Sequence, residues 1–230
     1  MLTPTDWVLI GSTLFLGIIA IIAPYGAELL KRSFLAPKLL ISFRQSPPIC
    51  RLASRRSIST PTSVVPSYEF HFQVKNRGKS QARQVEAVLE DIWIYDTSGK
   101  PSRIKDFVSV KLRYDNEGTR FVDINPERQI LWNLGYILSS PQHPWIRNEL
   151  LINAPEGEED GLRFFLDLLE RPFEQPNCFL PGIYGIKVVI YSENAKPSEV
   201  NFKIVWSGNW KETEKEMFQE IVIIKVKSSA

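Results

Sequence analysis

The chain has 230 residues, with 28 Lys and Arg against 26 Asp and Glu, a formal net charge of +2 and only two cysteines. Residues 57–230 carry 21 basic and 24 acidic side chains, and this slightly acidic balance argues against nucleic acid as a partner. Two cysteines cannot build a zinc site alone.

The N-terminal part contains a long apolar run. Residues 7–27 include no charged side chain, and as a helix they would extend about 31 Å, the thickness of a bilayer's hydrocarbon core. A cleaved export signal would need a basic start, a shorter apolar stretch and a small-residue cleavage site. We therefore expect an N-terminal segment over residues 1–36 with a transmembrane helix at about 7–30, an export signal being the alternative.

Basic residues follow this run, and no Asp or Glu stands between Glu28 and Glu69. Positive flanks stay on the cytoplasmic side, which predicts a single-pass protein of the cell inner membrane with a cytoplasmic C-terminal domain. The basic stretch is a topology signal on this interpretation. In the functional alternative, Lys31, Arg32 and Lys38 also contact anionic lipid headgroups.

A stripe of small residues runs along the expected helix at steps of four, three, four and three. Its members are Thr13, Gly17, Ala20, Pro24 and Ala27. Small residues let two helices approach closely in lipid, so the stripe is a possible surface for helix association and a homo-oligomer. Chance spacing in a lipid-facing helix is the open alternative.

Residues 37–230 form the expected second domain, which begins with an apolar strand at 38–44. A segment rich in Ser, Thr, Pro and Arg follows at 46–67 and predicts a loop, because it has no periodicity. From residue 68 the period is two: Tyr68, Phe70, Phe72 and Val74 alternate with polar residues, which indicates a half-buried antiparallel strand.

The rest of the chain repeats this strand pattern. Asn76 and Gly78 suit a turn with left-handed backbone, and the strand at 82–96 is long enough to need a bulge or bend. Further strands are expected at 107–114, 119–125, 128–137, 161–169, 182–194, 198–208 and 219–227, with one short helix at 210–218. About ten short strands without helical crossovers predict a mainly β fold, a two-sheet antiparallel sandwich.

Two stretches carry a family resemblance. "FQVKNRGKSQARQVEAVL" at 72–89 and "LPGIYGIKVVIYSENA" at 180–195 are similar to the immunoglobulin-like adhesion-type modules of bacteria. The whole chain resembles uncharacterised bacterial single-pass membrane proteins in which a membrane helix precedes such a sandwich. The resemblance implies an immunoglobulin-like sandwich with extra strands or insertions, and it implies no activity.

The search for chemistry finds no catalytic, cofactor-binding or metal-binding motif. His71 alternates onto the polar face of its strand, His143 lies in a proline-flanked loop, and neither has a partner at metal-ligand spacing. The acidic loop at 155–161 lacks calcium-loop spacing and is expected to be a solvated hairpin tip. Cys50 and Cys178 are expected to be free thiols in a reducing cytoplasm, or a bridge if the domain is exported.

Tryptophans are the remaining candidates for a binding surface. Trp93 and Trp132 lie within strands and are expected in the core, whereas Trp145, Trp206 and Trp210 stand near strand ends. The latter three could form a recognition platform for a peptide or sugar, or pack inward to close a corner of the sandwich.

Together these patterns predict a membrane-anchored sandwich that acts as an interaction or accessory module. Its partners would be the lipid bilayer and a protein of unknown identity, with no cofactor and no catalysis. The alternative is an extracytoplasmic module that binds a sugar or peptide ligand or serves in adhesion.

Overall fold

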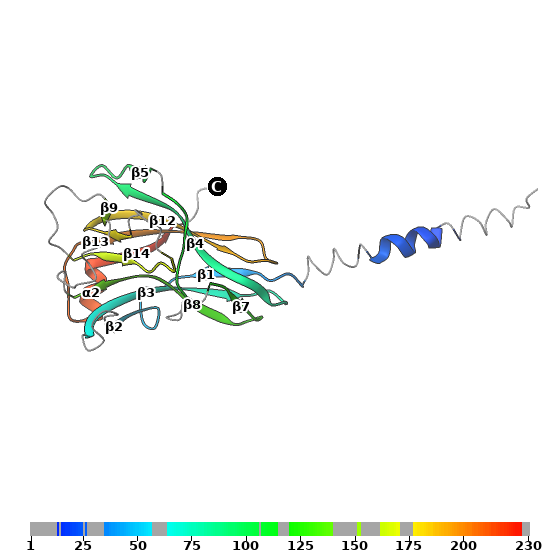
Figure 1. Cartoon of the computed structure of the whole chain (residues 1–230), viewed down its shortest axis with the longest axis horizontal. Helices are drawn as coiled ribbons and strands as arrows, with labels where there is room; N and C mark the ends of the chain where they lie inside the picture. The colour runs from blue at the N-terminus through cyan, green and yellow to red at the C-terminus, as the bar shows by residue number, and fades with distance from the viewer. Residues whose placement is uncertain are drawn as a thin grey trace, which may run out of the picture.

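The computed structural model describes residues 13, 15–24, 26, 35–56, 64–105, 107–114, 120–139, 151–152, 162–170 and 177–226. These residues fold mainly as strands, which form two β-sheets in a sandwich-like arrangement (Figure 1). The expected mainly β sandwich is therefore confirmed. The main hydrophobic core extends in sequence from Leu39 to Ile223, so strands from both ends of this region share it.

The first sheet has the strand order β1-β3-β8-β10-β11-β9, and β2 also pairs with β3. Its pairs are antiparallel except for β9 with β11. The bounds are β1 Leu39–Ser42, β2 Cys50–Arg56, β3 Val64–Asn76, β8 Gln129–Leu138, β9 Leu151–Ile152, β10 Phe164–Leu166 and β11 Cys178–Phe179.

The second sheet has the order β14-β13-β12-β4-β5, and all its pairs are antiparallel. The short strands β5, β6 and β7 lie one after another along the outer edge of β4. The bounds are β4 Ala82–Tyr95, β5 Pro101–Arg103, β6 Val110–Lys111, β7 Val122–Ile124, β12 Gly182–Tyr191, β13 Ser198–Trp206 and β14 Ile221–Val226.

Aromatic contacts join the two sheets across the core. The residues predicted to face inward from β3 (Tyr68, Phe70, Phe72 and Val74) are all fully buried. The ring of Phe72 lies 5.8 Å from that of Phe202 on β13, and the Phe179 ring of β11 lies 4.4 Å from that of Tyr184 on β12. Burial of such side chains stabilises each sheet against the other by about 1.5–3 kcal/mol per residue.

The predicted irregularity in the long strand β4 is confirmed. Lys187 of β12 pairs with Asp91 and Val188 pairs with Leu89, which leaves Glu90 as an extra residue on β4. Every second residue of β4 is buried from Val85 to Leu89, and the next buried residue is Ile92, three positions later. A bulge of this kind allows one long strand to keep apolar residues on the core face at both of its ends.

The prediction of a loop at 46–67 is wrong over much of that range. Residues 50–56 form β2 and residues 64–67 begin β3, while residues 57–63 lie outside the described part. β2 pairs with the first half of β3, and β1 pairs with the second half. The chain turns between β1 and β2 at residues 45–49. The sequence of β2 is polar because the strand lies at the sheet edge, where much of it stays exposed.

Side chains cover the backbone of the outer strands β1, β2 and β14. Gln45 bonds the β14 backbone twice, donating to the Ile221 carbonyl and accepting from Ile223 N at 2.9 Å. Lys225 Nζ donates to the Ile41 carbonyl of β1 at 2.8 Å. The short helix α2, Glu214–Glu220, close to the predicted 210–218, places Glu214 Oε1 2.8 Å from Leu52 N of β2. These contacts occupy backbone groups that would otherwise accept an added strand.

Asn76 organises the end of the sandwich where β1 begins. Its side chain is buried and bonds the backbone of four residues: Lys38, Gly78, Ser80 and Ile124. The expectation of left-handed backbone at Asn76 and Gly78 is wrong, because neither residue has a positive φ. Gly78 is required by close approach instead, since a Cβ there would lie 2.5 Å from the backbone nitrogen of Lys38.

Candidate functional site

The outer face of the first sheet carries a group of charged and polar side chains that is largely buried. We call it the outer-face cluster, and it consists of Arg55, Glu69, Asn133 and Asp167. Alternation turns Glu69 of β3 away from the core, Asn133 comes from the neighbouring β8, and Asp167 directly follows β10. The side chain of Asp167 is only 8% exposed, and a charge this buried is normally retained only with a partner.

Arg55 holds the cluster together. Its guanidinium donates to Asp167 Oδ2 at 2.8 Å and to Glu69 Oε1 at 3.1 Å. Asn133 Nδ2 donates to the same Asp167 oxygen at 3.2 Å, and Arg113 Nε lies 3.5 Å from the other. Both carboxylates are therefore engaged by the side chains around them.

The electrostatics of Arg55 favour its charged form. Burial by itself would lower the pKa of Arg55, but the negative charge of Asp167 and the hydrogen bond to it outweigh burial and raise the pKa above its usual value. The guanidinium carbon also lies 3.7 Å from the centre of the Tyr136 ring, in cation–π contact. Arg55 is thus a permanent cation fixed between two acids and an aromatic ring.

His71 borders the cluster as a neutral side chain. It lies on the outer face of β3, as alternation predicted, but it is buried rather than solvated. Its Nδ1 donates to the Ile49 carbonyl at 2.9 Å, and burial lowers its pKa despite this bond and the nearby charge of Glu69. At neutral pH the ring therefore serves as a structural hydrogen-bond donor.

A hollow of about 430 Å³ opens beside the outer-face cluster. Its lining residues are Arg51, Ala53, Ser54, Glu69, His71, Tyr114, Leu131 and Asn133. The lining combines both signs of charge with an aromatic ring and hydroxyl and amide groups, which suits recognition of a polar group.

The two carboxylates of the outer-face cluster are joined through Arg55, which donates to Asp167 and to Glu69. Of the two, Glu69 also lines the hollow. In the part of the chain that the structure describes, no three His, Cys, Asp or Glu side chains gather to hold a metal ion.

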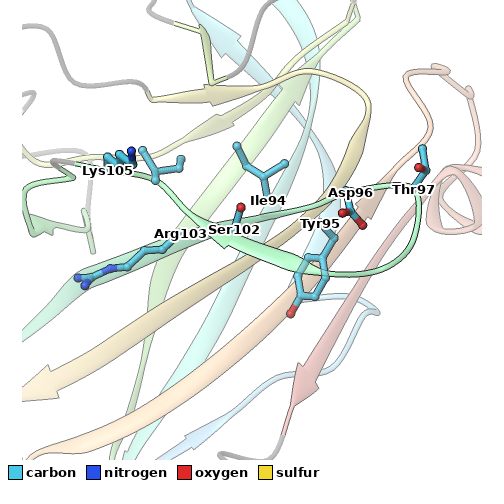
Figure 2. A pocket seen from close by; sticks show the side chains of 8 residues that line it. Ile94, Tyr95, Asp96, Thr97, Ser102, Arg103 and Lys105 are labelled. Atoms are coloured by element: carbon cyan, nitrogen blue, oxygen red, sulfur yellow. The ribbon is translucent and has the colours of Figure 1, made fainter.

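A second hollow of about 690 Å³ lies at the hairpin of β4 and β5 (Figure 2). Its labelled side chains diverge, with Ile94 and Tyr95 pointing to opposite sides of the hairpin. Asp96 Oδ1 accepts bonds from the backbone nitrogens of Ser98 and Lys100 at 2.9 Å, so its carboxylate closes the turn. Because the side chains do not converge, this hollow is a weaker candidate than the outer-face cluster.

The structure describes two of the three candidate tryptophans, Trp206 and Trp210. Trp206 is 2% exposed at the end of β13, and its Nε1 donates to the Leu162 carbonyl at 3.4 Å. Trp210 is half-buried with its ring 4.9 Å from that of Tyr68, and Trp145 lies outside the described residues. Of the two that can be placed, both pack inward. Trp132 is buried in the core as expected, while Trp93 is half-buried.

The predicted transmembrane helix is described only over residues 13, 15–24 and 26 of its expected range 7–30. Residues 15–24 are helical and lie clear of the sandwich in Figure 1. Among the described residues, no helix has both the length and the apolar character needed to cross a membrane. Of the small-residue stripe, Thr13, Gly17, Ala20 and Pro24 are exposed, and Ala27 is outside the described residues.

The apolar side chains of this helix are exposed on all sides. They are Phe15, Leu16, Ile18, Ile19, Ile21 and Ile22, with exposed fractions between 44% and 66%. Of the predicted headgroup contacts, Lys38 is exposed at the start of β1, while Lys31 and Arg32 lie outside the described residues.

Neither cysteine is part of a disulfide, and both side chains are fully buried. Burial raises the pKa of Cys50 to about 12, although hydrogen bonds from the backbone of His71 and Ser46 lower it. Fewer than about one thiol in a thousand is then ionised at pH 8. We expect neither cysteine to react with a thiol reagent at pH 8 in the folded chain and both to react in guanidinium. Stoichiometric labelling of the folded chain would contradict the buried placement.

The outer-face cluster was not predicted from the sequence. Arg55 lies in the segment interpreted as a loop, and its partner Asp167 is 112 residues away. One local signal was available: Asp167 interrupts the apolar run "FFLDLL" at 164–169, and a lone acid in a buried strand needs a partner.

Comparison with known proteins found no family model and no curated protein that matches this chain.

Proposed function

We propose that this chain is a single-pass, membrane-anchored β-sandwich that acts as an interaction or accessory module without catalysis. The observation that carries the proposal is the exposure of every large apolar side chain on the described helix from Phe15 to Ile22. A contiguous apolar surface of this kind on a soluble protein marks contact with a membrane or a partner.

Lipid is the occupant that fits this surface best. The apolar side chains surround the helix, whereas docking on one partner would use a single apolar stripe. Full burial of each such side chain contributes about 1.5–3 kcal/mol. The uncharged run at 7–27 has the length of a bilayer-spanning helix, and the basic residues after it favour a cytoplasmic sandwich at the cell inner membrane.

Strand pairing supports an immunoglobulin-like assignment within the sandwich. β3 pairs with β8 in one sheet, and β4 pairs with β12, which pairs with β13, in the other. This is the pairing of strands B with E and of C with F and G in an immunoglobulin-like domain. β14 and the group β9 to β11 would be the extra strands, in agreement with the resemblance to bacterial single-pass proteins.

The outer-face cluster is the surface we propose for the protein partner. Charges held in place by neighbouring side chains provide specificity more than affinity, which suits an accessory role. A second candidate function is extracytoplasmic binding of a sugar or peptide, favoured by the hollow beside Tyr114. The buried cysteines form no disulfide, which fits a reducing compartment and favours the first candidate.

Lysine substitutions in the helix test the anchor. We expect the full chain to float with phosphatidylcholine vesicles and to resist carbonate extraction. Ile18→Lys with Ile22→Lys should release it, because each charge at the centre of a membrane helix costs about 2.5–3.5 kcal/mol.

In the matched control, two exposed apolar residues of the sandwich are replaced by lysine instead. Leu52 and Ile224 are 45% and 49% exposed, and their replacement by lysine should leave flotation unchanged. Flotation of the helix variant at the level of the parent chain would refute the anchor.

A further inference from the structure

The end of the sandwich nearest the N-terminal helix is built from three turns and the start of β1. The turns join β3 to β4, β7 to β8 and β12 to β13, and all three reach the end of the sandwich at which β1 begins (Figure 1). We call this surface the basic end.

Exposed charge at the basic end is mainly positive. Its exposed basic residues in the described part are Lys38, Arg77, Lys79, Arg83, Arg128 and Lys196. Its exposed acidic residues there are Asp123, Glu127 and Glu193. Of the acids, Glu127 pairs with Lys75 at 2.6 Å and Asp123 accepts from Gln84 N at 2.9 Å. The six exposed cations therefore outnumber the three exposed acids.

Backbone contacts fix the basic residues relative to one another. Arg77 N donates to the Lys38 carbonyl at 2.7 Å, and Asn76 N donates to the Arg128 carbonyl at 3.0 Å. Asn194, two residues before Lys196, accepts from Arg83 N at 2.9 Å. The four segments thus form one connected surface whose backbone is held in place before any partner binds.

The helix α2 and the turn before it carry more negative than positive charge. Residues 210–220 carry Lys211 and Lys215 against four glutamates: Glu212, Glu214, Glu216 and Glu220. In Figure 1, α2 lies on the side of the sandwich away from the N-terminal helix. The molecule is therefore polarised along its long axis, with positive charge toward the helix.

We propose that the basic end is a docking surface for a bilayer that contains anionic lipids and that it holds the sandwich against the headgroups. The inference rests on the proposed anchor, and it adds residues from three turns far from the helix in sequence. Near an anionic surface each basic side chain raises the docked population about fivefold. A protein partner with an acidic face is the other class of occupant. Lipid is favoured because Lys38 follows the apolar run at 7–27 closely in sequence.

The test measures the distance of the basic end from the bilayer in the full chain. A fluorophore is attached through Asn125→Cys, an exposed position in the turn from β7 to β8, because the native cysteines are buried. Vesicles of phosphatidylcholine, with or without one quarter phosphatidylglycerol, carry a quencher on the lipid headgroup. A second label through Lys215→Cys reports on the far side.

We expect stronger quenching of the Asn125→Cys label in the anionic vesicles and no difference for the Lys215→Cys label. Replacement of Arg77, Lys79 and Arg128 by glutamine should lower the docked population about a hundredfold and return quenching to the neutral-lipid value. The same change at Lys100, Lys105 and Lys215, which are exposed elsewhere on the sandwich, should leave it unchanged.

Equal quenching of the Asn125→Cys label in neutral and anionic vesicles would overturn the basic end as a lipid surface, even if the chain floats with both. If the chain floats with anionic but not with neutral vesicles, and 1 M salt reverses the flotation, the basic end binds lipid and the anchor is refuted. Salt at this concentration screens only the charge contacts.

Discussion

Replacing Asn76 by alanine is expected to destabilise the sandwich by about 2–4 kcal/mol. The Asn76 side chain is fully buried and donates to the Ile124 and Ser80 carbonyls at 2.9 and 2.7 Å. It also accepts from Gly78 N at 2.9 Å and from Lys38 N at 3.2 Å. The bonds to Ile124 and Gly78 are buried, so alanine leaves those backbone groups without a partner or water.

Urea denaturation of the full chain in detergent micelles, followed by tryptophan fluorescence, gives the free energy of unfolding. Asn125→Ala is the matched control, since Asn125 is exposed in the neighbouring turn and its loss should change stability by less than about 0.5 kcal/mol. An Asn76→Ala variant as stable as the control would mean that Asn76 does not organise this end.

Removal of Asp167 is expected to have the second large effect, a loss of about 2–3 kcal/mol. Alanine there leaves the Arg55 charge, only 21% exposed, without its closest partner at 2.8 Å. Asn133 also loses an acceptor at 3.2 Å. The loss is smaller than for a fully buried pair because Arg55 keeps Glu69 at 3.1 Å.

The control for Asp167→Ala is Glu170→Ala, three residues later. Glu170 pairs with Arg120, but both side chains are more than 60% exposed, so this pair should contribute less than about 1 kcal/mol. In an Arg55→Ala background, Asp167→Ala should cost clearly less than in the parent chain, since the two residues interact directly. Equal costs in both backgrounds would show that Arg55 and Asp167 are not coupled.

Features that depend on residues close together in the sequence, such as strand alternation, were predictable. The alternation of β3 placed Tyr68, Phe70, Phe72 and Val74 in the core, and the length of β4 indicated its bulge. Both follow from the period of two in a strand that faces a core on one side. Strand β2 was missed because an exposed edge strand has no such alternation, so its serines and arginines resembled a loop.

The candidate surfaces depended on contacts that no local pattern carries. Arg55 and Asp167 meet only because β2 and β10 lie in the same sheet. Trp206 resembled a binding residue because it ends a strand, yet it packs inward and bonds the Leu162 carbonyl. The basic end likewise combines turns that are far apart in sequence, so its charge could not be summed before the topology was known.

Protease digestion of a C-terminally tagged chain in spheroplasts tests the central claim, a helix anchor with a cytoplasmic sandwich, most directly. We expect the tag to sediment with the membranes, to resist protease in intact spheroplasts and to be digested after lysis. A tag in the soluble fraction would contradict the anchor, and digestion in intact spheroplasts would contradict the orientation that the basic residues favour.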